Sequence, residues 1–128
     1  MKYLGIDYGK KRIGLAVSDI EGNLAFPHSV VKNDHNALGI IAKIIEGEQI
    51  GCVVVGESNN FDGQPNPIQN EIDKFIKQLE SIEMEFEINF EPEFLTSVQA
   101  QQITGKNESL DASAAAIILQ SYLDRRVQ

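Results

Sequence analysis

The sequence has a single cysteine, Cys52, so no disulfide bond can form within the chain. It also has no run of about 20 apolar residues, the length that a membrane-spanning helix needs. A strand-like pattern begins at the second residue in place of a signal peptide, and we therefore expect a cytoplasmic protein with no membrane partner. Linkers, repeats and low-complexity segments are missing as well. These absences favour a single domain over residues 1–128.

Positive charge is scarce. The chain has 11 Lys and Arg against 19 Asp and Glu, which gives a net charge of −8. This balance counts against a broad nucleic-acid-binding surface, because such surfaces are normally basic. A local basic patch remains open, and so does a site where metal ions join acidic side chains to a phosphate. The hydrophobic content of 42% is typical of a globular protein rather than a disordered one.

The first third of the chain has the pattern of an antiparallel meander. Residues 2–8 and 12–18 are predicted as paired strands, because apolar residues alternate along the second of them. Gly9 supplies the turn between these strands. Residues 24–31 are predicted as a third strand after a turn at 19–23.

Helical and strand patterns then alternate, and Asp34 is the expected N-cap of the first helix. The expected helices begin at Ala37, at Asn66-Pro67, at Phe94 and at Asp111, and the expected strands cover residues 50–55 and 85–90. This order predicts an α/β fold with a mixed five-stranded sheet, an antiparallel meander followed by parallel strands, and helices on both faces.

Three acidic residues stand where this architecture gathers functional groups, at the carboxyl ends of parallel strands. Asp7 lies near the end of the first strand, Glu93 follows the last strand, and Asp111 stands at the start of the last helix. Converging carboxylates with no His or Cys cluster favour Mg²⁺ or Mn²⁺, and two such ions support phosphodiester hydrolysis. Each acid also has a structural alternative: Asp111 as a helix cap, Glu93 as a solvated loop residue, and Asp7 as a buried acid with structural partners.

Polar residues near Asp7 and in one loop are candidates for substrate binding. Lys10, Lys11 and Arg12 either grip a phosphate backbone or form a solvated turn. Asn60, with Asp62, either orders a substrate loop or serves the geometry of a turn.

Four segments of the sequence resemble the YqgF-type family of Holliday-junction-resolvase-like nucleases. The resemblance extends from about Tyr3 to Asp124, and its first and last motifs are specific in combination. The matching segments are Gly5-Ile6-Asp7-Tyr8-Gly9 with Lys11-Arg12-Ile13-Gly14, Val53-Val54-Val55-Gly56 with Asn60-Phe61-Asp62-Gly63, Glu93 with Leu95-Thr96-Ser97, and Asp111-Ala112 with the helix after it.

This resemblance implies an RNase H-like fold and a metal-dependent hydrolase. It makes Asp7, Glu93 and Asp111 the metal-binding catalytic acids. It also adds Thr96 to the candidate substrate-binding residues Lys11 and Arg12. It also implies a nucleic-acid substrate, with processing of the 5′ end of precursor 16S ribosomal RNA favoured over cleavage of four-way DNA junctions.

The chain departs from the family pattern beside Glu93. Pro92 and Phe94 stand where the family has Asp and Arg, and loss of the arginine removes a phosphate clamp or a charge partner. A catalytically weak nucleic-acid- or ribosome-binding module is therefore an alternative. The Gly5–Gly9 segment also suggests the phosphate loop of an actin-like or sugar-kinase-like ATPase, although 128 residues leave room for only one of the two domains that fold uses. The sequence leaves the oligomeric state open.

Overall fold

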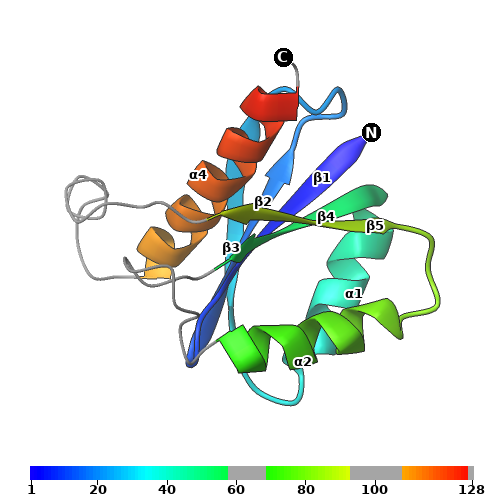
Figure 1. The fold of residues 1–128 in the computed structure, drawn as a ribbon, viewed down its shortest axis with the longest axis vertical. Coiled ribbons are helices and arrows are strands. Elements are labelled where there is room, and N and C mark those ends of the chain that lie inside the picture. The colour runs from blue at the N-terminus through cyan, green and yellow to red at the C-terminus, as the bar shows by residue number, and fades with distance from the viewer. Residues whose placement is uncertain (58–68, 93–107, 127–128) are drawn as a thin grey trace.

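The computed structural model describes residues 1–57, 69–92 and 108–126, and its strands form one central sheet (Figure 1). The elements in chain order are β1 (Lys2–Tyr8), β2 (Arg12–Ser18), β3 (Ala25–Lys32), α1 (Ala37–Gly47), β4 (Ile50–Glu57), α2 (Gln69–Glu80), β5 (Glu87–Pro92) and α4 (Glu108–Arg126). Within the described ranges, no helix has the length and apolar content to cross a membrane.

The sheet is mixed and has five strands in the order β3-β2-β1-β4-β5. The pairs β1–β2 and β2–β3 are antiparallel, whereas β1–β4 and β4–β5 are parallel. The register of the β2–β3 pair shifts between Leu15 and Ala16, where Leu15 lies opposite Ser29 and Ala16 lies opposite Pro27. The predicted meander followed by parallel strands is confirmed.

Helices cover both faces of the sheet, as expected from the sequence. Alternation along β1 sends Leu4 and Ile6 to one face, where they pack with buried residues of α1 and α2. Tyr3 points to the other face and joins a smaller core with Leu119 and Leu123 of α4. Figure 1 shows α4 on the side of the sheet opposite α1 and α2.

Helix α4 approaches β1 closely at Gly5. A Cβ atom at this position would lie 2.8 Å from the Cβ of Leu119 and 3.0 Å from the carbonyl oxygen of Ala115. The second of these atoms belongs to the helix backbone and cannot rotate away. The absence of a side chain at Gly5 therefore sets how near α4 lies to the sheet.

We expect Gly5→Ala to lower the free energy of unfolding by about 1–3 kcal/mol, because the added methyl group overpacks this contact. Gly39→Ala is the matched control. Gly39 is an exposed helical glycine with open space around its Cβ position, so alanine there should stabilise α1 by about 0.5–1 kcal/mol. Urea titration of both variants measures the difference, and a Gly5→Ala variant as stable as Gly39→Ala contradicts the packing argument.

The predicted start of α1 at Ala37 is confirmed, but its predicted N-cap is wrong, and so is the predicted start of the last helix. Asn36, rather than Asp34, is the N-cap of α1, and the Asp34 carboxylate instead accepts a hydrogen bond of 2.9 Å from the Asn36 amide. The last helix begins at Glu108, so Asp111 lies in its first turn and is not the cap. The predicted helix over 94–103 and the Asn66-Pro67 helix start lie outside the described residues.

Candidate nuclease site at the carboxyl edge

The ends of four strands meet at one end of the sheet, which we call the carboxyl edge. Strands β1, β4 and β5 are mutually parallel, and two successive antiparallel pairings give β3 the same direction. Tyr8, Lys32, Glu57 and Pro92 end these strands. Loops and helix starts that follow parallel strands form the binding sites of such sheets.

Asp7 lies at this edge, one residue before the end of β1. It is partly buried and stands opposite Gly14 of β2. A partly buried carboxylate in a strand requires compensation by hydrogen bonds, a counter-charge or a cation. Of the three predicted catalytic acids, Asp7 is the one whose side chain the structure describes.

The direction of α4 relates Asp111 to this edge. The rings of Tyr3 and Tyr122 lie 6.0 Å apart, and Gly5 faces Ala115 and Leu119, so α4 runs antiparallel to β1. The first turn of α4, which contains Asp111, therefore lies toward the end of β1 that carries Asp7. The side chain of Asp111 is outside the described part of the structure.

The other predicted site residues divide between described and undescribed segments. Glu93 directly follows Pro92 at the carboxyl edge, but Glu93, Thr96 and Asn60 lie outside the described residues. Lys11 lies in the turn between β1 and β2 and Arg12 is the first residue of β2, four and five residues after Asp7. Gly9 allows this turn to be tight, since a Cβ there would lie 2.5 Å from the Arg12 carbonyl oxygen. The predicted role of Gly9 is confirmed.

A groove of about 490 Å³ adjoins the turn between β1 and β2, and we call it the basic groove. Its described lining has four cationic side chains and no acidic one: Lys10, Lys11, Arg12 and Lys32, together with Val30 and Asn33. The sequence reasoning missed Lys32, because this lysine belongs to a different strand from the Lys10–Arg12 cluster. Its position at the exposed end of β3 was the available signal.

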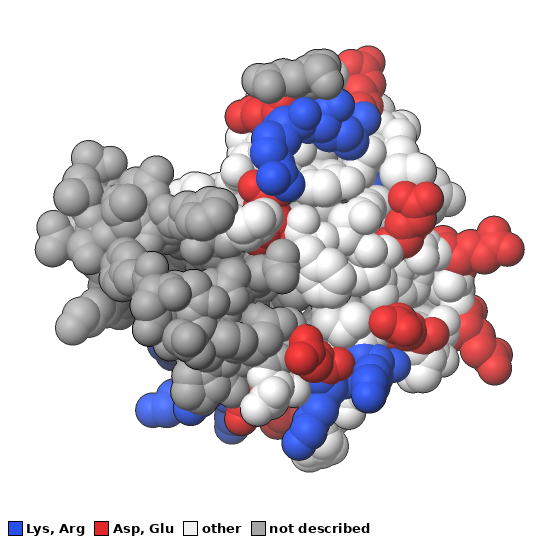
Figure 2. Space-filling view, viewed as in Figure 1, with Lys and Arg blue, Asp and Glu red and all other residues white. Residues whose placement is uncertain are grey.

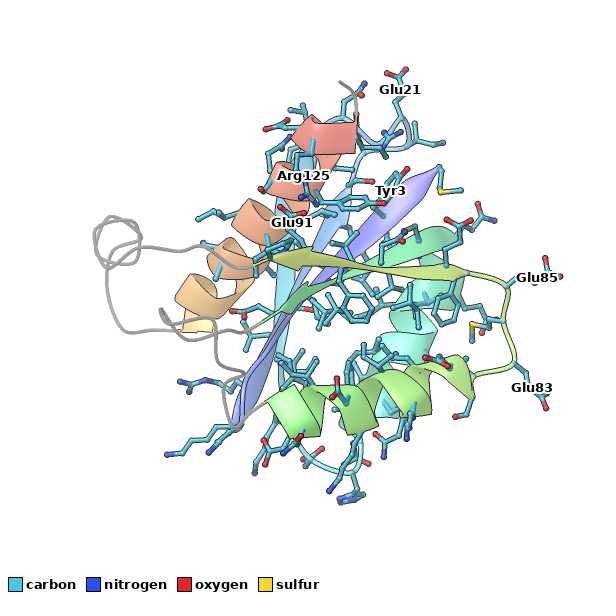
Figure 3. The ribbon with its side chains drawn as sticks, in the orientation of Figure 1. Tyr3, Glu21, Glu83, Glu85, Glu91 and Arg125 are labelled. Carbon is cyan, nitrogen blue, oxygen red and sulfur yellow. The ribbon has the colours of Figure 1, made fainter. Side chains whose placement is uncertain are left out.

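Figure 2 shows how charge is distributed over one face of the molecule. Acidic side chains prevail along the right-hand margin, where Figure 3 labels Glu83 and Glu85, and basic side chains gather near the lower and upper margins. The overall charge of −8 thus coexists with local basic regions.

An ion pair with a buried carboxylate joins the end of β5 to α4. The Glu91 side chain is only 4% exposed, and its carboxylate forms an ion pair with the Arg125 guanidinium and accepts a 2.8 Å hydrogen bond from the Ser121 hydroxyl. Figure 3 shows Glu91 and Arg125 facing each other between these elements. This contact anchors the chain two residues before Glu93. The sequence reasoning missed it, because Glu91 lies one residue beyond the strand expected over residues 85–90.

Two groups with shifted pKa values lie away from the carboxyl edge. Burial raises the pKa of the Cys52 thiol, which lies 3.1 Å from the Asn89 side-chain nitrogen near the start of β4. The Lys2 ammonium, 2.6 Å from the Glu48 carboxylate, lowers the pKa of that acid. Both groups lie toward the end of the sheet opposite the carboxyl edge, where Cys52 is part of the core and Glu48 forms an ion pair.

The donor chemistry at the carboxyl edge suits a hard divalent cation. Carboxylate oxygens are the preferred protein ligands of Mg²⁺ and Mn²⁺. Asp7 supplies such a group, β5 ends one residue before Glu93, and the first turn of α4 contains Asp111. Among the described side chains, no three His, Cys, Asp or Glu residues are gathered closely enough to hold a metal ion.

Comparison with known proteins identifies the family. The family model described as "RuvX: Holliday junction resolvase" matches residues 1–125. The chain belongs to the RuvX family. Relatives of this RuvX protein include a protein of Thermoanaerobacter pseudethanolicus with 31% identity, in which the alignment covers 97% of this chain and 96% of the relative. A second, from Natranaerobius thermophilus, is 34% identical over 99% of this chain and 96% of its own length. Both carry the name "Putative pre-16S rRNA nuclease".

Solved structures confirm the RNase H-like fold expected for a RuvX chain. Thermus thermophilus RuvC superposes with a TM-score of 0.69 at 16% identity, covering 99% of this chain and 96% of RuvC. The fowlpox virus resolvase in complex with Holliday junction DNA gives a TM-score of 0.63 at 15% identity, with both chains covered in full. At these identities the likeness concerns the fold.

Proposed function

We propose that this protein is a divalent-metal-dependent endonuclease that hydrolyses phosphodiester bonds of precursor 16S ribosomal RNA in the cytoplasm. The observation that carries the proposal is the position of Asp7 at the carboxyl edge, on the strand that leads into the turn lining a groove with four cationic side chains. Membership of the RuvX family and the names of the relatives support the same activity.

In this proposal Asp7, Glu93 and Asp111 hold one or two Mg²⁺ or Mn²⁺ ions. Such ions, when bound, activate a water molecule and neutralise charge on the scissile phosphate. The three metal-binding acids belong to three different segments of the chain. The site is therefore complete only when β1, the segment after β5 and the start of α4 are in place. This arrangement makes activity sensitive to the packing of α4 against the sheet.

The basic groove binds the substrate backbone. Lys10, Lys11 and Lys32 are exposed cations that offset phosphate charges without reading the base sequence. Asn60 and Thr96 are the further substrate-binding residues of the proposal. Phe94, in the place of the family arginine, removes one cation, and we propose that the basic groove provides most of the remaining phosphate affinity.

The test is cleavage of an RNA spanning the 5′ end of 16S rRNA and its precursor sequence, in Mg²⁺ or Mn²⁺. We expect a discrete product that EDTA abolishes and that excess divalent metal restores. A four-way DNA junction of equal phosphate content, assayed in parallel, separates the RNA proposal from junction cleavage. Binding of the RNA without any product, in either metal, would contradict the nuclease and favour the non-catalytic module.

A further inference from the structure

A second cavity opens at the carboxyl edge, next to the basic groove. We call it the Tyr8 pocket. It measures about 510 Å³ and is lined by Tyr8, by Asn33 and Asp34 of the segment before α1, and by Glu71, Lys74 and Phe75 of α2. Its size lies within the usual range of small-ligand sites. Of these residues, Asn33 also lines the basic groove, and the others have no part in the nuclease site proposed above.

Asn33 connects the two cavities, since it lines both. Its side-chain amide donates a 2.7 Å hydrogen bond to the Gly9 carbonyl, and its backbone amide donates a 2.9 Å bond to the Lys11 carbonyl. These bonds fix the turn that carries Lys10 and Lys11 against the end of β3. A nucleic-acid strand bound in the basic groove therefore lies next to the Tyr8 pocket, and the Asn33 segment separates the two cavities.

An aromatic surface forms part of the pocket. The rings of Tyr8 and Phe75 lie 5.2 Å apart with an interplanar angle of 46°, and Phe75 is almost fully buried. Phe75 thus packs against the Tyr8 ring on the side of the core, while Tyr8 itself remains partly exposed. Aromatic side chains of this kind stack on nucleobases regardless of sequence.

The charges of the two cavities differ in a way that suits different parts of a nucleotide. The described lining of the basic groove is cationic, whereas the Tyr8 pocket mixes the acids Asp34 and Glu71 with Lys74. Carboxylates in the pocket repel phosphate but accept hydrogen bonds from the exocyclic amino groups of bases. The groove therefore suits the backbone and the pocket suits a base.

We propose that the Tyr8 pocket takes one unpaired nucleobase of the strand whose phosphates occupy the basic groove. This inference rests on the proposed nuclease function and specifies its substrate class as single-stranded or looped RNA. A base in a duplex reaches such a pocket only after unpairing, which costs a few kcal/mol. Unpaired RNA avoids this cost and is the form in which bases are usually stacked on aromatic side chains.

The test measures binding of an unstructured RNA of about 12 nucleotides, a length within the usual range of single-strand sites. Binding is followed by fluorescence anisotropy in Ca²⁺, and RNA length is checked afterwards on a gel. We expect Tyr8→Ala to weaken binding about 5- to 150-fold, the equivalent of one lost base stack. Tyr8→Phe should bind within about twofold of the native protein, because stacking needs the ring and not the hydroxyl.

A scan with one abasic nucleotide at each position identifies the base involved. One position should reproduce the Tyr8→Ala loss in the native protein and show no further loss with Tyr8→Ala, since both changes remove the same contact.

Lys32→Gln is the contrasting variant. It should weaken binding of intact, abasic and duplex RNA alike. It should also reduce the slope of log K against log salt concentration by about 0.7–0.9, which corresponds to the loss of one phosphate contact. Lys77→Gln, an exposed cation of α2 outside both cavities, should change nothing.

The inference is overturned if no abasic position weakens binding, or if Tyr8→Ala weakens duplex and abasic RNA as much as intact RNA. Either result would give Tyr8 a structural role only. The cleavage assay above remains separate: base-dependent binding without cleavage would refute the nuclease and leave the pocket assignment standing. Cleavage without base-dependent binding would refute the pocket assignment alone.

Discussion

Asp7→Asn should reduce the cleavage rate of precursor rRNA at least about 10³-fold while leaving the fold intact. The substitution keeps the shape of the side chain but removes the negative charge that the proposed metal site requires. Metal ions contribute several kcal/mol of charge stabilisation in the transition state, and about 4 kcal/mol corresponds to a factor of 10³ in rate. Single-turnover cleavage in saturating Mn²⁺ measures the effect on chemistry rather than on binding.

Glu85→Gln is the matched control for this variant. It removes the same charge from an exposed acid that lies far from the carboxyl edge, as Figure 3 shows. We expect this variant to cleave at the native rate, and both variants to retain native melting temperatures within a few degrees. An Asp7→Asn protein that keeps more than about a tenth of the native rate would refute the metal-binding role of Asp7.

Arg125→Met should lower the free energy of unfolding by about 2–3 kcal/mol, because it leaves the Glu91 carboxylate buried without its counter-charge. Methionine keeps much of the apolar stem, so the change mainly removes the ion pair and its hydrogen bond. The Arg125 side chain is 57% exposed, and this places the expected cost below that of a fully buried pair. The melting temperature should fall by roughly 6–15 °C.

Two further variants separate charge from packing. Glu91→Gln combined with Arg125→Met should recover part of the lost stability, since no uncompensated carboxylate remains. Lys2→Met breaks the Lys2–Glu48 pair, whose side chains are 28% and 34% exposed, and should cost at most about 1 kcal/mol. If Arg125→Met costs no more than Lys2→Met, the burial of Glu91 does not determine the strength of its ion pair.

The strand order and layers could be predicted because local patterns determine them. Alternation of Ile13, Leu15 and Val17 with smaller residues marks a strand, and the continuous apolar run over residues 50–55 marks a strand covered on both faces. The structure gives β2 the predicted bounds and extends β4 to Glu57. Patterns of this kind involve only neighbouring residues of the chain, so they can be found in the sequence.

Features that depend on contacts between distant segments could not be predicted. Glu91 is buried because Ser121 and Arg125 of α4 reach it, and nothing in the sequence near Glu91 signals this. Lys32 joins Lys10 and Lys11 only through the pairing of β2 with β3. The α4 start was misplaced because Asp111 is a good N-cap residue by type, whereas the helix continues back to Glu108.

The shift of register between β2 and β3 affects how the molecule behaves at high concentration. Strand β3 forms one edge of the sheet, and an exposed edge can pair with a strand of another molecule. The shift bends the edge beside Pro27, which has no amide hydrogen to donate, and Lys32 adds a charge at the end of the strand. These three features together protect β3 against edge-to-edge aggregation.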